Sequence, residues 1–232
     1  MKPVALAGAG EAGGLPRAAE TGAARLAARL LAPEFADFAA RAIIVALFTF
    51  MAVRLCADFL ATGRLNGLLL LASEGLVVLL TLFRRSAGTI DRSMRARTLT
   101  ALSMIGPPLV RPASTAPLAP ETLTVLFSLA GLLVVIFGKL SLGRSFGLMP
   151  ANRGVVSTGL YRHVRHPIYL GYLLTHVAFA AAQPTSWNLL VLAVSDTGLL
   201  MRAVCEEQTL AKDETYRDYL SRVRWRVLPG VF

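Results

Sequence analysis

Charged residues are scarce in this chain of 232 residues: Asp, Glu, Lys and Arg make up 16% of it. Together with 55% hydrophobic residues and a mean hydropathy of +0.58, this scarcity excludes an ordinary soluble domain and predicts an integral membrane protein. Cysteine is also rare. Cys56 and Cys205 have neither a metal-ligand spacing nor the pattern of a disulfide framework, so we expect inert packing thiols and no metal site.

Acidic residues are fewer than basic ones, 14 against 24, and the formal net charge is +10. Such an excess can indicate a nucleic-acid-binding protein. Here, however, the basic residues lie between apolar runs, and no basic face interleaved with aromatic residues is present. The charge is therefore interpreted as a topology signal, and no nucleic-acid partner is expected.

The N-terminal third predicts a tail followed by two membrane helices. Residues 1–34 are rich in Ala and Gly and have no compact apolar core with a small-residue cleavage site. They predict a poorly ordered tail or a surface helix rather than a cleaved signal peptide. Apolar runs over residues 38–60 and 66–83 are long enough to span a bilayer.

Charged residues interrupt both runs. Arg54 and Asp58 are four apart, so we expect them to pair on one helix face near the membrane boundary. Glu74 lies near the middle of the second run, where a carboxyl group should face protein or water rather than lipid. It is either a neutral acid bonded inside the helix bundle or part of a substrate site.

The middle of the chain is less regular. Residues 98–110 are short and are broken by Gly106, Pro107 and Pro108, so they either span the membrane thinly or re-enter it. The proline-rich segment 111–120 predicts a turn. Residues 121–138 are a clean apolar run and predict another membrane helix.

The C-terminal part predicts a helical hairpin and an amphipathic tail. Apolar runs over 168–182 and 187–204 are separated by a four-residue turn, Gln183–Ser186. Beyond them, residues 202–232 alternate apolar and charged positions, which predicts a helix at the membrane surface or docked on the hairpin. The fold class is therefore an all-α integral membrane protein with five or six transmembrane helices.

Lys and Arg outside the tail are concentrated in three segments, 84–97, 139–166 and 202–226. The positive-inside rule places these segments in the cytoplasm.

The stretch 157–172, STGLYRHVRHPIYLGY, stands out as a basic approach to an apolar helix. Pro167 suits the first turn of a helix, because its missing N–H would have no intrahelical partner there. Guanidinium groups and free backbone N–H groups at one helix start favour an anionic or carboxylate-bearing ligand. The hairpin returns Glu206 and Glu207 to the level of Pro167. These carboxylates form either a simple ion-pair network with the basic cluster or a functional site.

Three segments together resemble the isoprenylcysteine carboxyl methyltransferase family, which includes phospholipid methyltransferases. They are GLYRHVRHPIYLG, then RAVCEE after the hairpin, and then YRDYLSRVRWRVLPG. The resemblance covers roughly residues 139–230. It implies an S-adenosylmethionine-dependent enzyme with a lipophilic acceptor that enters from the bilayer, and an active site that faces the cytoplasm. It also implies a division into tail (1–34), acceptor chamber (35–138) and cofactor-binding catalytic unit (139–232).

The resemblance also implies which residues form the site. The cofactor-binding set is Tyr161, Arg165, His166, Pro167, Tyr169, Gly171, Glu206 and Glu207. The catalytic candidates are Arg165, Arg202 and Glu206: an arginine would hold a carboxylate acceptor, whereas Glu206 or His166 would serve as base for an amine.

Carboxyl O-methylation of an isoprenylcysteine-like or other apolar acid is the first hypothesis, and phospholipid N-methylation is its alternative. An NADPH-dependent steroid-type reductase carries a similar R-H-P-x-Y-x-G segment, and a non-catalytic transporter or binding protein is a further alternative.

Overall fold

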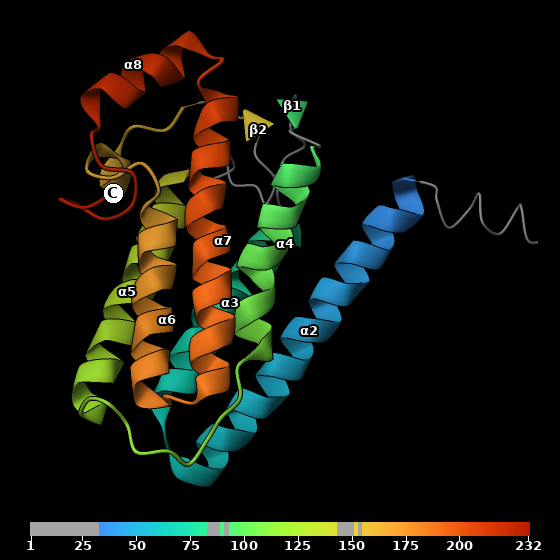
Figure 1. Cartoon of the computed structure of the whole chain (residues 1–232), viewed down its shortest axis with the longest axis vertical. Coiled ribbons are helices and arrows are strands. Elements are labelled where there is room, and N and C mark those ends of the chain that lie inside the picture. The colour runs from blue at the N-terminus through green and yellow to red at the C-terminus, as the bar shows by residue number, and fades with distance from the viewer. Residues whose placement is uncertain (1–32, 83–88, 91–92, 143–150, 153–154) are drawn as a thin grey trace, which may run out of the picture. The chain divides into compact units, whose positions relative to one another are not determined.

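The structure is a computed structural model that describes residues 33–82, 89–90, 93–142, 151–152 and 155–232. Its contacts divide the chain into two units, 1–42 and 43–232, and everything below concerns the second unit. Most of the described residues lie in seven α-helices (Figure 1). They are α2 (Pro33–Thr62), α3 (Leu65–Leu82), α4 (Met94–Leu109), α5 (Glu121–Leu142), α6 (Pro167–Ala182), α7 (Ser186–Leu210) and α8 (Glu214–Arg222).

Strand is limited to a two-residue antiparallel pair within the described residues. It joins β1 (Thr89–Ile90) to β2 (Ala151–Asn152). A single 3-10 turn, η2 (Gly159–Arg162), precedes α6. The predicted all-α class is therefore confirmed.

Three described helices are long and apolar enough to cross a membrane: Ala42–Thr62 of α2, α5 and α7. The 16-residue α6 is apolar but shorter. An integral membrane protein is thus supported, while the count of five or six crossings and the orientation stay predictions. The basic loop around residues 84–92 lies largely outside the described residues.

The C-terminal hairpin forms as its sequence predicts. Pro167 occupies the first turn of α6. At the other end of α6, the Thr185 side chain accepts a hydrogen bond from the Asn188 backbone N–H and so caps the start of α7. Because this cap and the three-residue link fix a tight reversal, α7 returns beside α6 and continues beyond the start of that helix (Figure 1).

Glycines bring neighbouring helices into backbone contact at two seams. Between α5 and α6, a Cβ added at Gly171 would lie 2.7 Å from the Gly131 carbonyl oxygen. Between α4 and α7, a Cβ at Gly106 would lie 2.4 Å from the Ser195 Cβ, and one at Gly198 2.9 Å from the Leu102 Cβ. Small residues allow such close approach in membrane helices. Gly171, a predicted cofactor residue, therefore packs against α5.

The predicted break at Pro107 and Pro108 is wrong, because α4 runs through both residues to Leu109. Both prolines fall in the last turn, and Pro107 deprives the Ser103 carbonyl of its donor four residues ahead. The Ser195 hydroxyl of α7 donates to that carbonyl oxygen instead (2.9 Å). A partner on a neighbouring helix thus satisfies the freed acceptor, as membrane helices require.

Replacing Ser195 by Ala is expected to lower the free energy of unfolding by about 1–2 kcal/mol, because the Ser103 carbonyl loses the hydrogen bond that Ser195 donates to it. Reversible unfolding in mixed micelles measures the change. Ser221→Ala, which removes an exposed hydroxyl bonded within α8, is the matched control and should change little. Equal destabilisation by both variants would contradict the role given to Ser195.

The predicted pair of Arg54 and Asp58 does not form. Gly63 adopts a positive φ of 72° directly after α2 and turns the chain back, so that Arg64 pairs with Asp58 at 2.8 Å. Arg54 instead donates to the backbone carbonyl of Val110 at the end of α4. The spacing of four residues permits a pair between Arg54 and Asp58 on one helix face. The turn at Gly63 brings Arg64 to Asp58 instead.

The amphipathic tail docks on the hairpin. Three residues of α8 and its C-cap, Tyr216, Tyr219 and Val223, form a small buried cluster. The Tyr219 hydroxyl donates to the Tyr161 carbonyl oxygen (2.8 Å), so α8 is tied to η2. These contacts agree with docking on the hairpin, and the placement of the tail relative to the membrane surface stays a prediction.

Candidate active site

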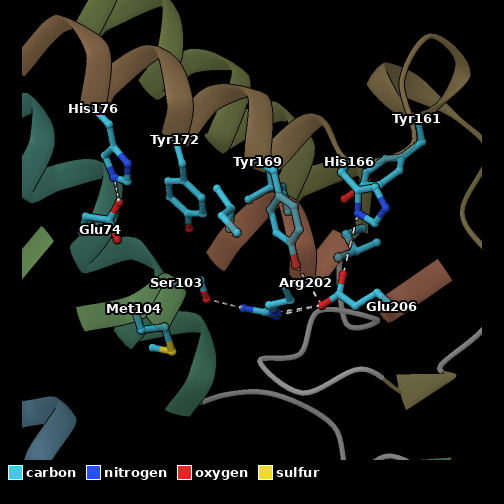
Figure 2. A pocket seen from close by; sticks show the side chains of 13 residues that line it. Glu74, Ser103, Met104, Tyr161, His166, Tyr169, Tyr172, His176, Arg202 and Glu206 are labelled. Carbon is cyan, nitrogen blue, oxygen red and sulfur yellow. Dashed lines mark hydrogen bonds and ion pairs between the residues drawn. The ribbon is translucent and has the colours of Figure 1, made fainter. Parts of the chain in front are cut away.

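A cavity opens along one side of α6. Four side chains of this helix and its N-cap, spaced three or four residues apart, face it: His166, Tyr169, Tyr172 and His176 (Figure 2). This spacing places them on one stripe of the helix. Ile168 of α6 also lines the cavity. The remaining lining residues come from α3, α4, α5, η2 and α7, and they are Glu74, Ser103, Met104, Leu142, Tyr161, Leu199, Arg202 and Glu206.

Glu206 organises the end of the cavity nearest the start of α6. Its Oε1 accepts a hydrogen bond from the Tyr169 hydroxyl (2.8 Å) and two from the Arg202 guanidinium (3.0 and 2.9 Å). The Nδ1 of His166 lies 3.7 Å from the other oxygen, Oε2. The Arg202 Nη1 reaches the Ser103 hydroxyl at 3.4 Å. Arg202 and Glu206 are one helical turn apart on α7, which fixes the pair geometrically.

Glu207, the neighbouring carboxylate, holds the C-terminal tail. Its Oε2 accepts hydrogen bonds from Arg165 Nη1 (3.2 Å) and Arg226 Nε (2.9 Å). Arg165 also donates to the backbone carbonyls of Val223 (2.7 Å) and Leu220 (3.2 Å). Neither Glu207 nor Arg165 lines the cavity. Each of the three guanidinium nitrogens of Arg165 thus donates to the tail or to Glu207, and the predicted catalytic role of Arg165 stays a prediction.

The tail also pairs with the segment that leads into α6. The backbone N–H groups of Arg165 and His166 donate to the carbonyl oxygens of Trp225 (2.9 Å) and Arg226 (2.8 Å). The ring of His166 is stacked on that of Tyr169, with centroids 5.1 Å apart. The tail therefore sets the position of His166, which in turn faces both carboxylates.

Two buried polar atoms at this junction have unused bonding capacity among the described residues. His166 Nε2 and Glu207 Oε1 lie 3.3 Å apart, but they are not aligned for a hydrogen bond and have no other partner there. A buried donor or acceptor left unpaired is costly. Together with Glu206, these atoms suit a ligand that carries an ammonium group, hydroxyls and a carboxylate, as S-adenosylmethionine does.

The tyrosines outside the membrane-spanning helices are neutral. Burial raises the pKa of Tyr161 well above its usual value, and burial likewise raises the pKa of Tyr216 and Tyr219. Their phenol groups therefore stay protonated at physiological pH. Tyr161 lines the cavity as a neutral side chain, whereas Tyr216 and Tyr219 anchor α8.

The sequence analysis identified the residues at one end of the cavity but missed those at the other. Five of the predicted site residues, Tyr161, His166, Tyr169, Arg202 and Glu206, line the cavity, and Pro167 starts α6, which carries Tyr169. Their cofactor-binding and catalytic roles stay predictions. Missed were Tyr172, His176 and the carboxylate of Asp196, which meets His176. The signal that would have found them is the polar stripe at three- and four-residue spacing in an otherwise apolar helix.

Residues 122–217 match the family model for phospholipid methyltransferase, which belongs to the group of membrane methyltransferases that includes the isoprenylcysteine enzymes. No curated protein matches the chain significantly. The match runs from α5 into α8 and therefore includes the whole hairpin with His166, Arg202 and Glu206. The match confirms, over this part of the chain, the resemblance to membrane methyltransferases that the sequence motifs indicate.

Proposed function

We propose that this protein transfers a methyl group from S-adenosylmethionine to a lipophilic acid within the membrane. The observation that carries the proposal is the Glu206–Arg202–His166 arrangement at the base of the hairpin, within the stretch that matches the methyltransferase family. The cavity leads from this arrangement along α6 to Tyr172, His176 and Glu74.

The cofactor would bind between the end of α7 and the tail. Glu206 and the Oε1 of Glu207, which lies 3.3 Å from His166 Nε2 but accepts no hydrogen bond from a described residue, offer negative charge to its ammonium group and acceptors to its ribose hydroxyls. His166 Nε2 offers a donor to its carboxylate. The tail, held by Arg165, covers this position. When bound, the cofactor supplies an activated methyl group on a positively charged sulfur.

Arg202 is the group proposed to hold the acceptor's carboxylate. It lines the cavity, and its charge is neutralised here by Glu206. If Glu206 turns to the cofactor's ammonium group, the guanidinium becomes available to a second carboxylate. The carboxylate oxygen then forms a bond to the methyl carbon while the carbon–sulfur electron pair leaves with sulfur, so no proton has to move. The protein contributes alignment and a water-poor cavity.

Phospholipid N-methylation is the second candidate, and the description of the matching family favours it. An amine acceptor must lose a proton before or during transfer, and Glu206 or His166 is placed to accept it. The same match argues against a steroid-type reductase and against a non-catalytic transporter. An active site on the cytoplasmic side follows from the positive-inside rule and is part of the proposal.

The bond formed separates these candidates. Purified protein in nanodiscs is incubated with methyl-labelled S-adenosylmethionine and either an apolar acid, such as palmitic acid, or phosphatidylethanolamine. A methyl ester releases labelled methanol in mild base, whereas an N-methyl group does not. We expect base-labile label on the acid. Base-stable label on the phospholipid alone would replace the first candidate by the second, and binding of NADPH without S-adenosylhomocysteine would contradict both.

A further inference from the structure

The cavity continues along α6 beyond the group around Glu206. Tyr172 lies one turn farther along the helix than Tyr169, about 5 Å along the axis, and His176 lies about one turn beyond Tyr172. Figure 2 shows Tyr172 and His176 pointing to the same side of the helix as Tyr169, with Glu74 opposite His176. The far end of the cavity, formed by Glu74, Tyr172 and His176, is called the deep end below.

His176 is held between two carboxylates from different helices. Its Nδ1 lies 2.5 Å from Asp196 Oδ1 on α7, and its Nε2 lies 3.2 Å from Glu74 Oε1 on α3. His176 and Glu74 are buried, with 3% and 6% of their surfaces exposed. Ionisable groups at membrane depth are costly and are retained where they face a cavity or a partner. These three side chains use one another as partners, so they form a fixed polar wall.

Tyr172 has no such partner. Its side chain is 8% exposed, and its hydroxyl makes no hydrogen bond to any described residue. The ring is well fixed: it is stacked on His176, with centroids 6.2 Å apart, and the Lys139 Nζ lies 5.3 Å from its centroid. A rigid, buried hydroxyl that lines a cavity and lacks a partner has its hydrogen-bonding capacity available for a ligand.

The charges around the deep end favour an uncharged ligand group. Two potential cations, His176 and Lys139, lie near two carboxylates, Glu74 and Asp196. An ionised ligand group would add an uncompensated charge in a low-dielectric site, which is costly. A hydroxyl or carbonyl oxygen adds none, and a tyrosine hydroxyl can donate to either.

We propose that the deep end is a second acceptor subsite, in which Tyr172 recognises a hydroxyl or carbonyl oxygen on the acceptor. The inference rests on the proposed function, because it places the methylated group beside Arg202. The recognised oxygen would lie about one turn of α6 beyond Tyr169, whose ring centroid is 5.6 Å from the Arg202 guanidinium carbon. The acceptor class is thus an apolar acid that bears an uncharged oxygen a few bonds from its carboxylate, rather than a plain hydrocarbon acid.

Palmitic acid and 3-hydroxypalmitic acid test this subsite, because they differ only in the added hydroxyl. Their dissociation constants are measured from thermal-unfolding titrations of the detergent-purified protein with S-adenosylhomocysteine bound. The hydroxy acid is expected to bind the wild type about tenfold more tightly, as one buried hydrogen bond provides. Tyr172→Phe should abolish this preference with little change for palmitic acid.

Thr175→Val is the matched control, because it removes a hydroxyl one turn along α6 that is bonded to the Tyr172 carbonyl and does not line the cavity. It should keep the preference. Equal binding of the two acids by the wild type, a preference that survives Tyr172→Phe, or binding of neither acid would overturn the subsite. Tighter binding of hexadecylamine than of either acid would overturn its neutral character. Absence of S-adenosylhomocysteine binding would count against the proposed function itself. This outcome separates a failure of the proposed function from a failure of the subsite alone.

Discussion

Glu206→Gln is expected to lower the rate of methyl transfer at least about a hundredfold, with the protein still folded. The substitution keeps the shape of the side chain but removes the charge that Arg202 and the Tyr169 hydroxyl now satisfy. Removing one pre-positioned electrostatic partner from an enzyme site typically costs 10²–10³ in rate. Initial rates at saturating cofactor, with the affinity for S-adenosylhomocysteine measured alongside, separate a binding loss from a loss in the chemical step.

Glu214→Gln is the control for this experiment. Glu214 lies in the first turn of α8, is exposed, and pairs only with the exposed Arg217. Exposed pairs contribute little, so its activity should match the wild type. If Glu206→Gln retained the activity of Glu214→Gln, Glu206 would have no part in the reaction.

Glu207→Gln is expected to release the tail and with it the cofactor. A buried carboxylate that binds both Arg165 and Arg226 becomes a neutral amide, which leaves two guanidinium groups without their anion. Breaking a buried ion pair costs about 3–5 kcal/mol. Amide hydrogens of residues 223–228 and those of Arg165 and His166, whose N–H groups donate to the tail, should exchange at least about a hundredfold faster.

Hydrogen exchange and titration with S-adenosylhomocysteine measure the two parts of this prediction on one sample. Arg217→Gln, which removes an exposed arginine of α8, serves as the reference. Faster exchange with unchanged binding would show that the tail is not needed to hold the cofactor. Unchanged exchange would show that backbone pairing and the α8 cluster hold the tail without Glu207.

The hairpin and its polar end were predictable because each step is local or follows from helix length. Pro167 marks a helix start, the Gln183–Ser186 turn marks the reversal, and the returning helix is long enough to bring Glu206 and Glu207 back to the start of the first. Which carboxylate does what was not predictable. Adjacent residues on a helix point about 100° apart, so Glu206 faces the cavity and Glu207 faces the tail.

The remaining differences arise where the partner comes from a distant segment. Nothing near Pro107 in the sequence indicates that Ser195 donates to the carbonyl it leaves free. Nothing near Asp58 except Gly63 indicates that Arg64 turns back to it. Glu74 was expected to meet protein rather than lipid, and it does, but His176 is its partner from a helix 102 residues away in the chain.

The two glycine seams restrict how a lipid can reach the reaction site. Backbone contact at Gly131 and Gly171 leaves no width for an acyl chain between α5 and α6, and Gly106 and Gly198 close the gap between α4 and α7 in the same way. An acyl chain is several ångströms wide, so neither crevice can serve as its doorway. For the proposed lipophilic acceptor, the two seams are therefore walls of the bundle and not points of entry.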